Sequence, residues 1–192
     1  MALGERFCEA LGFAARLHAE QMRKVSGTPY VAHLLRVAGI VLEHGGDEDT
    51  AIAALLHDAI EDQGGAVTGE EIGRRFGPRV LQIVAACSDT DQTPKPPWRA
   101  RKEAYLERLR TAPFAVRLVS AADKLDNARS LAADYRRLGE TLWEHFRGGR
   151  EGTLWYYRSV VEILKTPGGP IVDELDRAVA ELERLARGTG HP

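Results

Sequence analysis

The sequence Leu55-Leu56-His57-Asp58-Ala59-Ile60-Glu61-Asp62 places four ionisable side chains in a stretch that is otherwise apolar. The run from Ala51 to Ile60 contains no glycine or proline, which predicts a helix that continues to Asp62. At about 100° per residue, the four ionisable side chains fall within an arc of roughly 140° on this helix. Burying three carboxylates beside one imidazole is costly unless a compact positive charge compensates them. The stretch therefore indicates half of a metal site, although a single His-Asp pair on a helix is more often solvated or hydrogen-bonded within the protein.

Composition describes an ordinary globular protein. The chain has 192 residues, of which 44% are hydrophobic and 28% are charged, and its formal net charge is -2. This length suits one domain with one buried core, so we assign residues 1–187 to a single domain and residues 188–192 to a disordered tail. Because acidic and basic residues balance along the chain, no nucleic-acid partner is expected.

The cysteines and the N-terminal sequence bear on cellular location. Cys8 and Cys87 are far apart and form no CxxC pair, so neither a zinc-thiolate site nor a disulfide framework is indicated. No apolar signal core follows a basic start, and no stretch approaches about 18 uninterrupted apolar residues. We expect a reduced, cytoplasmic setting with no membrane partner. The sequence leaves the oligomeric state open.

Glycine and proline divide the chain into helical segments. Helices are expected over residues 3–18, 28–44, 49–62, 68–76, 78–87, 98–110 and 113–138, around residue 143, and over residues 153–165 and 171–187. Thr28 before Pro29, and the capping-box pattern that begins at Thr68, indicate two of the helix starts. Residues 91–97 contain three prolines and predict a surface loop. With no alternating strand pattern, the sequence predicts an all-α fold of about eight to ten helices.

Two further residues complete the candidate metal site. His33 lies one turn into the second expected helix, and Asp123 lies in an acidic island of the long helix over residues 113–138. Most single histidines in such a position are core or surface residues, but with His57 and Asp58 these two supply two imidazoles and two carboxylates. That donor set suits Mn²⁺, Fe²⁺ or Zn²⁺ better than Ca²⁺ or Mg²⁺. Four protein ligands in a shell of about six leave room for water and a substrate oxygen, which predicts catalysis rather than a structural ion.

The order of these residues resembles the H…HD…D pattern of the HD superfamily of metal-dependent phosphohydrolases. More specific are the segments around them: residues 23–33, residues 55–62, and Asp123-Lys124-Leu125-Asp126-Asn127. Together they resemble the hydrolase domain of the RelA/SpoT family, and in particular its small stand-alone alarmone hydrolases, such as the metazoan SpoT homologue. The resemblance implies an HD-domain helical bundle and the Mn²⁺-dependent hydrolysis of guanosine 3′,5′-bis(diphosphate), (p)ppGpp, to GDP or GTP and pyrophosphate.

The resemblance also implies roles for single residues. One Mn²⁺ per chain, or alternatively Fe²⁺ or Zn²⁺, would be held by His33, His57, Asp58 and Asp123. Such an ion lowers the pKa of a bound water and polarises a phosphoryl oxygen. The adjacent Glu61-Asp62 pair would then carry the general acid and base work, without a division of roles between the two carboxylates.

The guanine nucleotide substrate would be bound by basic and polar residues on both sides of that centre. These are Arg23, Lys24, Asn127, Ser130, Lys102 and Arg101. The first two would meet the guanine base and the phosphates, because an Arg plane stacks on a purine and a Lys pairs with phosphate. Asn127 would meet the ribose, and Ser130 lies on the same helix face. The last two are candidates for the pyrophosphate.

Three residues depart from the usual family sequence, and two other functions stay open. Val25 is an extra residue in the basic loop, Leu34 replaces the usual proline, and Asp126 replaces the usual His or Tyr before Asn127. The third departure bears on substrate identity. One alternative is an HD phosphohydrolase for another nucleotide, such as a phosphorylated dinucleotide cofactor or an adenosine alarmone. The other is a catalytically silent domain that senses a nucleotide or binds a protein, against which the intact Glu61-Asp62 pair argues.

Overall fold

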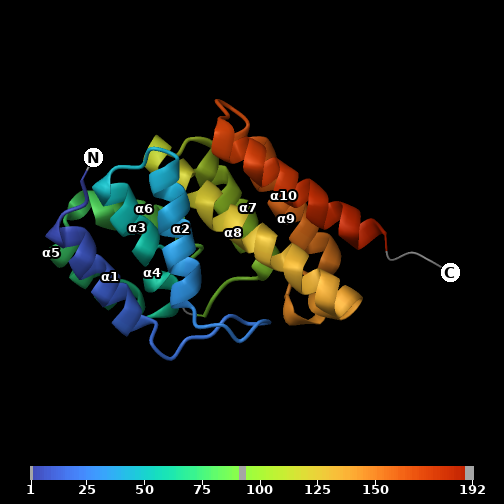
Figure 1. The fold of residues 1–192 in the computed structure, drawn as a ribbon, viewed down its shortest axis with the longest axis horizontal. Helices are drawn as coiled ribbons and strands as arrows, with labels where there is room; N and C mark the ends of the chain where they lie inside the picture. Colours follow the sequence, from blue (N-terminus) through green and yellow to red (C-terminus); the bar gives the residue numbers. More distant parts are fainter. Residues whose placement is uncertain (1, 91–93, 189–192) are drawn as a thin grey trace.

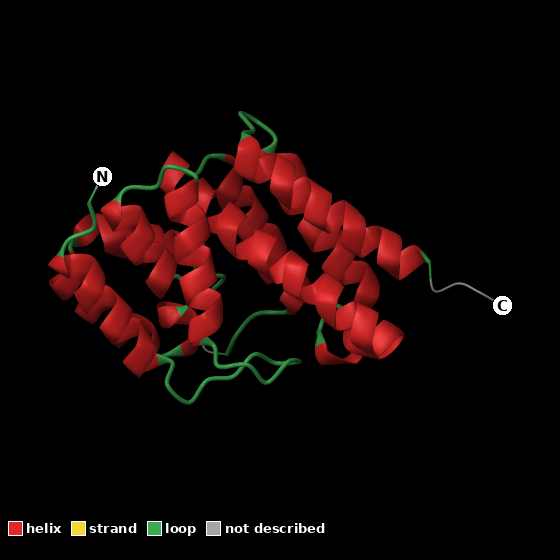
Figure 2. Cartoon of the chain, in the orientation of Figure 1, coloured by secondary structure: helices red, strands yellow, loops and turns green. Residues whose placement is uncertain are grey.

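The computed structural model describes residues 2–90 and 94–188, and it confirms the all-α prediction (Figures 1 and 2). These residues form ten α-helices and one 3₁₀ helix. Their bounds are α1 Glu5–Leu17, α2 Val31–Glu43, α3 Glu48–Leu56, α4 Ala59–Asp62, α5 Gly65–Phe76, α6 Pro78–Cys87, α7 Trp98–Arg110, α8 Phe114–Leu138, η1 Gly139–His145, α9 Gly149–Leu164 and α10 Pro170–Arg187. No helix among the described residues is both long enough and apolar enough to cross a bilayer.

The 25-residue helix α8 is the centre of the bundle. It packs against α10 along one side and against α2, α3 and α6 on the other (Figure 1). Leu55 and Leu56 of α3 and Leu125 of α8 are fully buried in the single hydrophobic cluster that joins these helices. The assignment of residues 1–187 to one domain stays a prediction. The packing brings α2, the end of α3 and the middle of α8 together.

The helix expected over residues 49–62 is interrupted, so that part of the prediction was wrong. Asp47 caps α3 by accepting a hydrogen bond from the Thr50 N–H at 2.9 Å, and the helix ends at Leu56. His57 and Asp58 form a turn before the short helix α4 begins. The Ala54 carbonyl oxygen near the end of α3 accepts a hydrogen bond from the His57 ring. Because the helix is interrupted here, the adjacent side chains of His57 and Asp58 can face the same point.

Two of the expected helix starts were also wrong. The Arg23 N–H donates to the Thr28 carbonyl oxygen at 2.7 Å, and the Tyr30 N–H donates to the Gln21 carbonyl oxygen at 2.8 Å. These bonds hold the segment of residues 21–30 as an extended loop, so α2 begins only at Val31. The hydroxyl of Thr68 donates to the Gln63 carbonyl oxygen inside α5, which begins three residues earlier than expected.

Most of the remaining helix predictions agree with the structure, and the start of α9 is the exception. Helices α6, α7, α8 and α10 begin and end within one residue of the predicted positions, and η1 is the short helix expected around Trp143. Helix α9 begins four residues before its predicted start. Residues 94–97 are non-helical as expected, whereas the rest of that predicted loop, residues 91–93, and the tail at 189–192 lie outside the described residues.

Candidate metal centre and active site

Two imidazoles converge between α2 and the turn that follows α3. His33 and His57 are 0% and 2% exposed, and their ring centroids are 5.2 Å apart. The Nε2 atom of each ring is buried and has no hydrogen-bond partner of acceptable geometry within the described part of the chain. A buried nitrogen without a partner is costly. Each ring therefore directs toward the centre a nitrogen that could bind a metal ion.

The two predicted carboxylate ligands lie beside these nitrogens. The Asp58 Oδ2 atom is 3.0 Å from His57 Nε2 and 3.7 Å from His33 Nε2. The Asp123 Oδ1 atom is 3.3 Å from His33 Nε2 and 3.6 Å from His57 Nε2. One ligand atom each from His33, His57 and Asp58 lies within 4.8 Å of the others, a spacing that suits one ion. Two imidazole nitrogens flanked by two carboxylates fit a divalent metal of the Mn²⁺, Fe²⁺ or Zn²⁺ type.

Asp123 differs from Asp58 because protein groups bind both of its carboxylate oxygens. Its Oδ1 atom accepts a hydrogen bond from the Asn127 side-chain amide at 2.5 Å, and Lys124 pairs with its Oδ2 atom. It is also not part of the three-residue group whose ligand atoms all lie within 4.8 Å of one another. Its Oδ1 atom still faces both imidazoles.

The other ring nitrogen of each histidine is fixed by a strong acceptor. His57 Nδ1 is 2.8 Å from the Ala54 carbonyl oxygen, which can only accept, so Nδ1 carries the proton. His33 Nδ1 is 2.6 Å from the Asp126 Oδ2 atom. A proton on Nδ1 leaves Nε2 free to act as a ligand.

Electrostatics explains how the cluster tolerates its buried charges. Burial lowers the pKa of His57, but the carboxylates of Asp58 and Asp123 outweigh it and raise this pKa well above its usual value. Burial raises the pKa of Asp58, but the charge and hydrogen bond of His57 outweigh it and lower this pKa. These carboxylates therefore favour a cation at His57 Nε2. In the metal-free protein that cation is a proton, which a bound metal ion would replace.

The Glu61 and Asp62 side chains point to different neighbours. Asp62 Oδ2 accepts a hydrogen bond from the Gln21 amide at 2.8 Å, while Glu61 Oε1 lies 3.1 Å from Lys95 Nζ. The other Glu61 oxygen accepts from the Asp89 N–H at 3.2 Å. Burial and then the Asp58 charge raise the pKa of Asp62. The sequence predicts that the two carboxylates act as one acid-base pair, but in the structure each binds different partners.

Four of the predicted substrate-binding residues line one cavity of about 630 Å³, which we call the Arg23 pocket. These four are Arg23, Lys24, Asn127 and Ser130, and Tyr30 and Asp62 line the same cavity. The Arg23 guanidinium donates to the Asn127 side-chain oxygen at 2.8 Å and lies 5.8 Å from the Tyr30 ring centroid. The Arg23 cation and the Tyr30 aromatic ring make this pocket suitable for a nucleoside.

The other two predicted residues, Arg101 and Lys102, line a second cavity of about 540 Å³, the Lys102 pocket. Its cations are Lys24, Lys95, Arg101, Lys102, Lys124 and Arg147. Asp89 pairs with Arg101 and lies 3.1 Å from the Lys102 amine. Lys24 and Asn127 line both pockets, so the two cavities adjoin. So many cations in one cavity suit a polyphosphate.

Sequence reasoning missed several residues of this site. The Tyr30 hydroxyl donates to Asp58 Oδ2 at 2.6 Å, and Gln21 binds Asp62. Asp89 anchors Arg101 and Lys102 from the end of α6. The only available signals were a tyrosine three residues before His33 and an acidic residue just before the proline loop, and neither pattern is specific.

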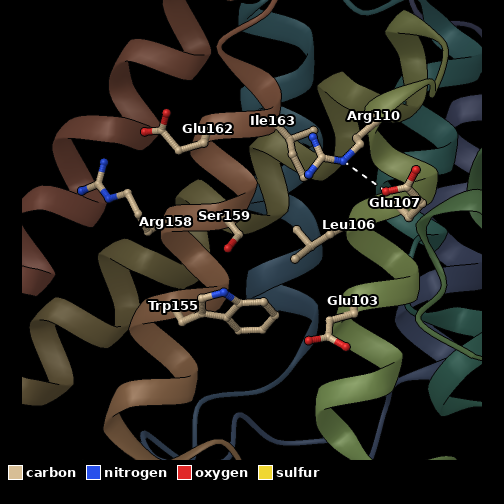
Figure 3. A pocket seen from close by; sticks show the side chains of 9 residues that line it. All are labelled: Glu103, Leu106, Glu107, Arg110, Trp155, Arg158, Ser159, Glu162 and Ile163. Carbon is tan, nitrogen blue, oxygen red and sulfur yellow. Dashed lines mark hydrogen bonds and ion pairs between the residues drawn. The ribbon is translucent and has the colours of Figure 1, made fainter.

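A third cavity, of about 530 Å³ between α7 and α9, contains none of the predicted site residues (Figure 3). Glu103 and Glu107 of α7 face Trp155 and Ser159 of α9 across it, and the Glu107 carboxylate pairs with Arg110 at 3.2 Å. Glutamates and arginines both line this groove, whereas the Lys102 pocket is lined by cations, so the groove is less suited to a polyphosphate.

Comparison with known proteins gives a consistent result. The sequence model of the HD domain matches residues 10–154. A Xenopus tropicalis protein named guanosine-3′,5′-bis(diphosphate) 3′-pyrophosphohydrolase MESH1 is 43% identical over 126 residues, which cover 64% of this chain and 68% of that protein. A Drosophila melanogaster protein of the same name is 36% identical over 174 residues, covering 89% of this chain and 91% of its own length.

Solved structures agree with the sequence relatives. One, described as a metazoan ortholog of SpoT that hydrolyses ppGpp and plays a role in starvation responses, matches with a TM-score of 0.79 at 29% identity, covering 94% of this chain and 97% of that chain. A protein from Listeria monocytogenes EGD-e matches with a TM-score of 0.67 at 28% identity, covering 81% of this chain and 99% of that chain. The expected HD-domain bundle is thereby confirmed, and this chain belongs to the HD-domain family.

Proposed function

We propose that this protein is a Mn²⁺-dependent cytoplasmic hydrolase that converts (p)ppGpp to GDP or GTP and pyrophosphate. The observation that carries the proposal is the pair of buried, unpartnered Nε2 atoms of His33 and His57. They lie between two carboxylates, Asp58 and Asp123. Tyr30, which donates to Asp58, lines the aromatic Arg23 pocket, and Lys124, which pairs with Asp123, lines the strongly cationic Lys102 pocket. The relatives named as guanosine-3′,5′-bis(diphosphate) 3′-pyrophosphohydrolases supply the substrate.

The proposed ion would be held by His33, His57, Asp58 and Asp123. When bound, it would act as a Lewis acid on a phosphoryl oxygen and lower the pKa of water. The Tyr30 hydroxyl and the Asn127 amide donate to Asp58 and Asp123 respectively, which orients the two carboxylates.

The two adjoining pockets can hold the two ends of one nucleotide. The Arg23 pocket takes the guanosine, with the Arg23 plane on the base and Asn127 at the ribose. The Lys102 pocket takes phosphate, because its cations offset the charge of a diphosphate. Lys24 lines both cavities and would bind a phosphate next to the ribose.

In the proposed reaction a water oxygen bonds to the phosphorus that is joined to ribose O3′. The bond from phosphorus to O3′ breaks, pyrophosphate leaves, and the ribose regains its 3′-hydroxyl. One proton must leave the water, and one must reach O3′. Asp62 suits proton transfer, because burial and the charge of Asp58 raise its pKa above the usual value of an aspartate. Glu61 is the second carboxylate of the proposed acid-base pair, held by Lys95.

The experiment is a substrate panel with Mn²⁺-loaded protein, in which ³¹P NMR identifies each product. We expect ppGpp and pppGpp to give pyrophosphate, with kcat/KM well above the values for NADPH and nucleoside monophosphates. A His57→Ala variant purified in parallel controls for contaminating phosphatases. Orthophosphate as the main product, or faster turnover of NADPH, would overturn the assigned substrate. Metal-loaded protein that turns over none of these compounds would contradict the enzymatic function.

A further inference from the structure

Asp126 is a buried carboxylate next to the metal centre. The family resemblance did not predict this position for it. It lies on α8, is 3% exposed, and has its Oδ2 atom 2.6 Å from His33 Nδ1. Arg36 of α2 donates to both of its oxygens, from Nε at 2.5 Å and from Nη2 at 3.2 Å. Three N–H donors from one helix therefore hold this carboxylate.

The structure gives Asp126 protein partners, His33 and Arg36, at the position before Asn127 where a substrate contact was expected. Neither the Arg23 pocket nor the Lys102 pocket includes Asp126 among its lining residues. The carboxylate instead borders a groove between α2 and α8 that Gly39 also lines and that shares Arg36 and Ser130 with the Arg23 pocket. Both oxygens of Asp126 are bound by groups of α2, and the one at 2.6 Å from His33 Nδ1 links the carboxylate to the metal centre.

The contact determines which nitrogen of His33 faces the centre. A carboxylate at 2.6 Å from Nδ1 favours the tautomer with its proton there, and the bond also fixes the rotation of the ring. The opposite nitrogen, Nε2, then faces Asp58 and Asp123 with a free lone pair. His57 reaches the same state by another route, because its Nδ1 binds the Ala54 carbonyl oxygen within its own chain segment.

We infer that Asp126 is a positioning residue that holds His33 as a divalent-cation ligand, with Arg36 fixing the carboxylate in turn. The inference rests on the proposed function for the presence of the metal, but the tautomer and orientation of His33 can be measured without it. Helix α2 also packs on α8 and buries Val37, Ile40 and Val41, so the two helices have apolar contacts besides this ion pair.

The test uses Asp126→Ala, which removes the acceptor, and Asp126→Asn, which keeps an oxygen but loses the charge. Glu174 provides the control, because its carboxylate also lies between an arginine and a histidine, 2.9 Å from Arg129 and 3.6 Å from His44, and Glu174 itself lines none of the described pockets. Thermal unfolding of every variant checks that it is folded. The two decisive readouts are ¹⁵N–¹H correlation spectra of the histidine rings in metal-free protein and the Mn²⁺ dissociation constant.

In wild type and in Glu174→Ala we expect a strongly downfield Nδ1–H resonance from His33, assigned by its loss in His33→Gln. Asp126→Ala should lose this resonance while that of His57 remains, and its Mn²⁺ dissociation constant should rise about 10- to 100-fold. Asp126→Asn should fall between wild type and Asp126→Ala in Mn²⁺ affinity.

Two outcomes would overturn the inference. One is an Asp126→Ala variant that keeps the His33 Nδ1–H resonance and wild-type Mn²⁺ affinity. The other is an equal loss of affinity in Glu174→Ala, which would reveal a general structural effect. If wild type hydrolyses no ppGpp, the proposed function fails, while the ring spectra still decide the role of Asp126.

Discussion

The candidate metal ligands and the cations around them are held in place by different kinds of contact. His33 and His57 are fixed through single ring hydrogen bonds inside a closely packed helical core. Arg101 and Lys102 are fixed by ion pairs to Asp89, which lies between helices α6 and α7. A ligand set must be rigid to select an ion, whereas phosphate-binding cations can exchange a protein carboxylate for a substrate oxygen. Changes in the two regions should therefore separate loss of metal from loss of substrate affinity.

The largest effect should follow Asp123→Ala, which removes one side of the metal centre. Metal content should fall from about one ion per chain to near zero, because the remaining ligands lose their carboxylate partner on α8. Loss of several kcal/mol of Lewis-acid stabilisation should reduce ppGpp hydrolysis about 10³-fold or more. Elemental analysis and a product assay measure both. Full metal occupancy in this variant would exclude Asp123 as a ligand.

The next largest effect concerns the acid-base pair. Asp62→Asn keeps the size of the side chain but removes a carboxylate that lines the Arg23 pocket. Metal content should not change, since Asp62 binds Gln21 and not the centre, while kcat should fall about 10²- to 10⁴-fold. Steady-state kinetics at full Mn²⁺ loading measures this, and metal loss equal to that of Asp123→Ala would contradict it.

Glu61→Gln is the companion variant, because Glu61 is bound by Lys95 rather than by Gln21. We expect it to keep its metal and to lose activity over the same range of about 10²- to 10⁴-fold. If its rate stays within a few-fold of wild type, Glu61 contributes only an ion pair worth about 0–1 kcal/mol to stability. Proton transfer would then be assigned to Asp62.

A smaller effect should follow Lys102→Gln in the cationic pocket. A hydrogen bond to a charged group is worth about 1.5–3 kcal/mol, which corresponds to roughly a 10- to 100-fold loss in kcat/KM. The loss should appear mainly in KM, with metal content unchanged. Lys165→Gln is the matched control, since Lys165 pairs with Glu162 and Asp176 away from both pockets. An equal change in the control variant would show that the effect is one of general charge.

The smallest effect concerns solvent access to the interior near the metal centre. Burial raises the pKa of the Cys87 thiol to about 11, so at pH 9 only about 1% of it is thiolate, whereas Cys8 is exposed. Iodoacetamide at pH 9 should therefore label Cys8 and leave Cys87 unmodified in folded protein, as peptide mass spectrometry would reveal. Labelling of Cys87 as fast as Cys8 would show that the interior is open.

Helix periodicity and breaker residues were sufficient to predict most of the fold. Pro78, Pro113 and Pro170 lie at or next to the starts of α6, α8 and α10, and local propensity agrees with packing in these helices. The convergence of His33 with the His57-Asp58 pair was also predictable. These polar residues lie within otherwise apolar helical patterns, so burying their apolar neighbours brings them into the interior as well. The roles of these residues stay proposals.

The rest depends on contacts between segments that are distant in sequence. The Arg36–Asp126 pair spans 90 positions, and the Arg23–Asn127 contact spans 104, so no local pattern could indicate either. The turn at His57 was missed because a ring hydrogen bond to Ala54, rather than a glycine or proline, accompanies the end of α3. Asp89 could not be found because its partners Arg101 and Lys102 lie beyond a proline-rich loop.

The most direct test of the central claim is a crystal structure of the Mn²⁺-loaded protein with anomalous scattering data collected at the manganese edge. We predict one strong peak within bonding distance of the Nε2 atoms of His33 and His57 and of carboxylate oxygens of Asp58 and Asp123. His33 should keep its Nδ1 contact with Asp126 in that structure. A peak that instead lies in the Lys102 pocket or in the groove between α7 and α9, with the two Nε2 atoms unbound, would contradict the account.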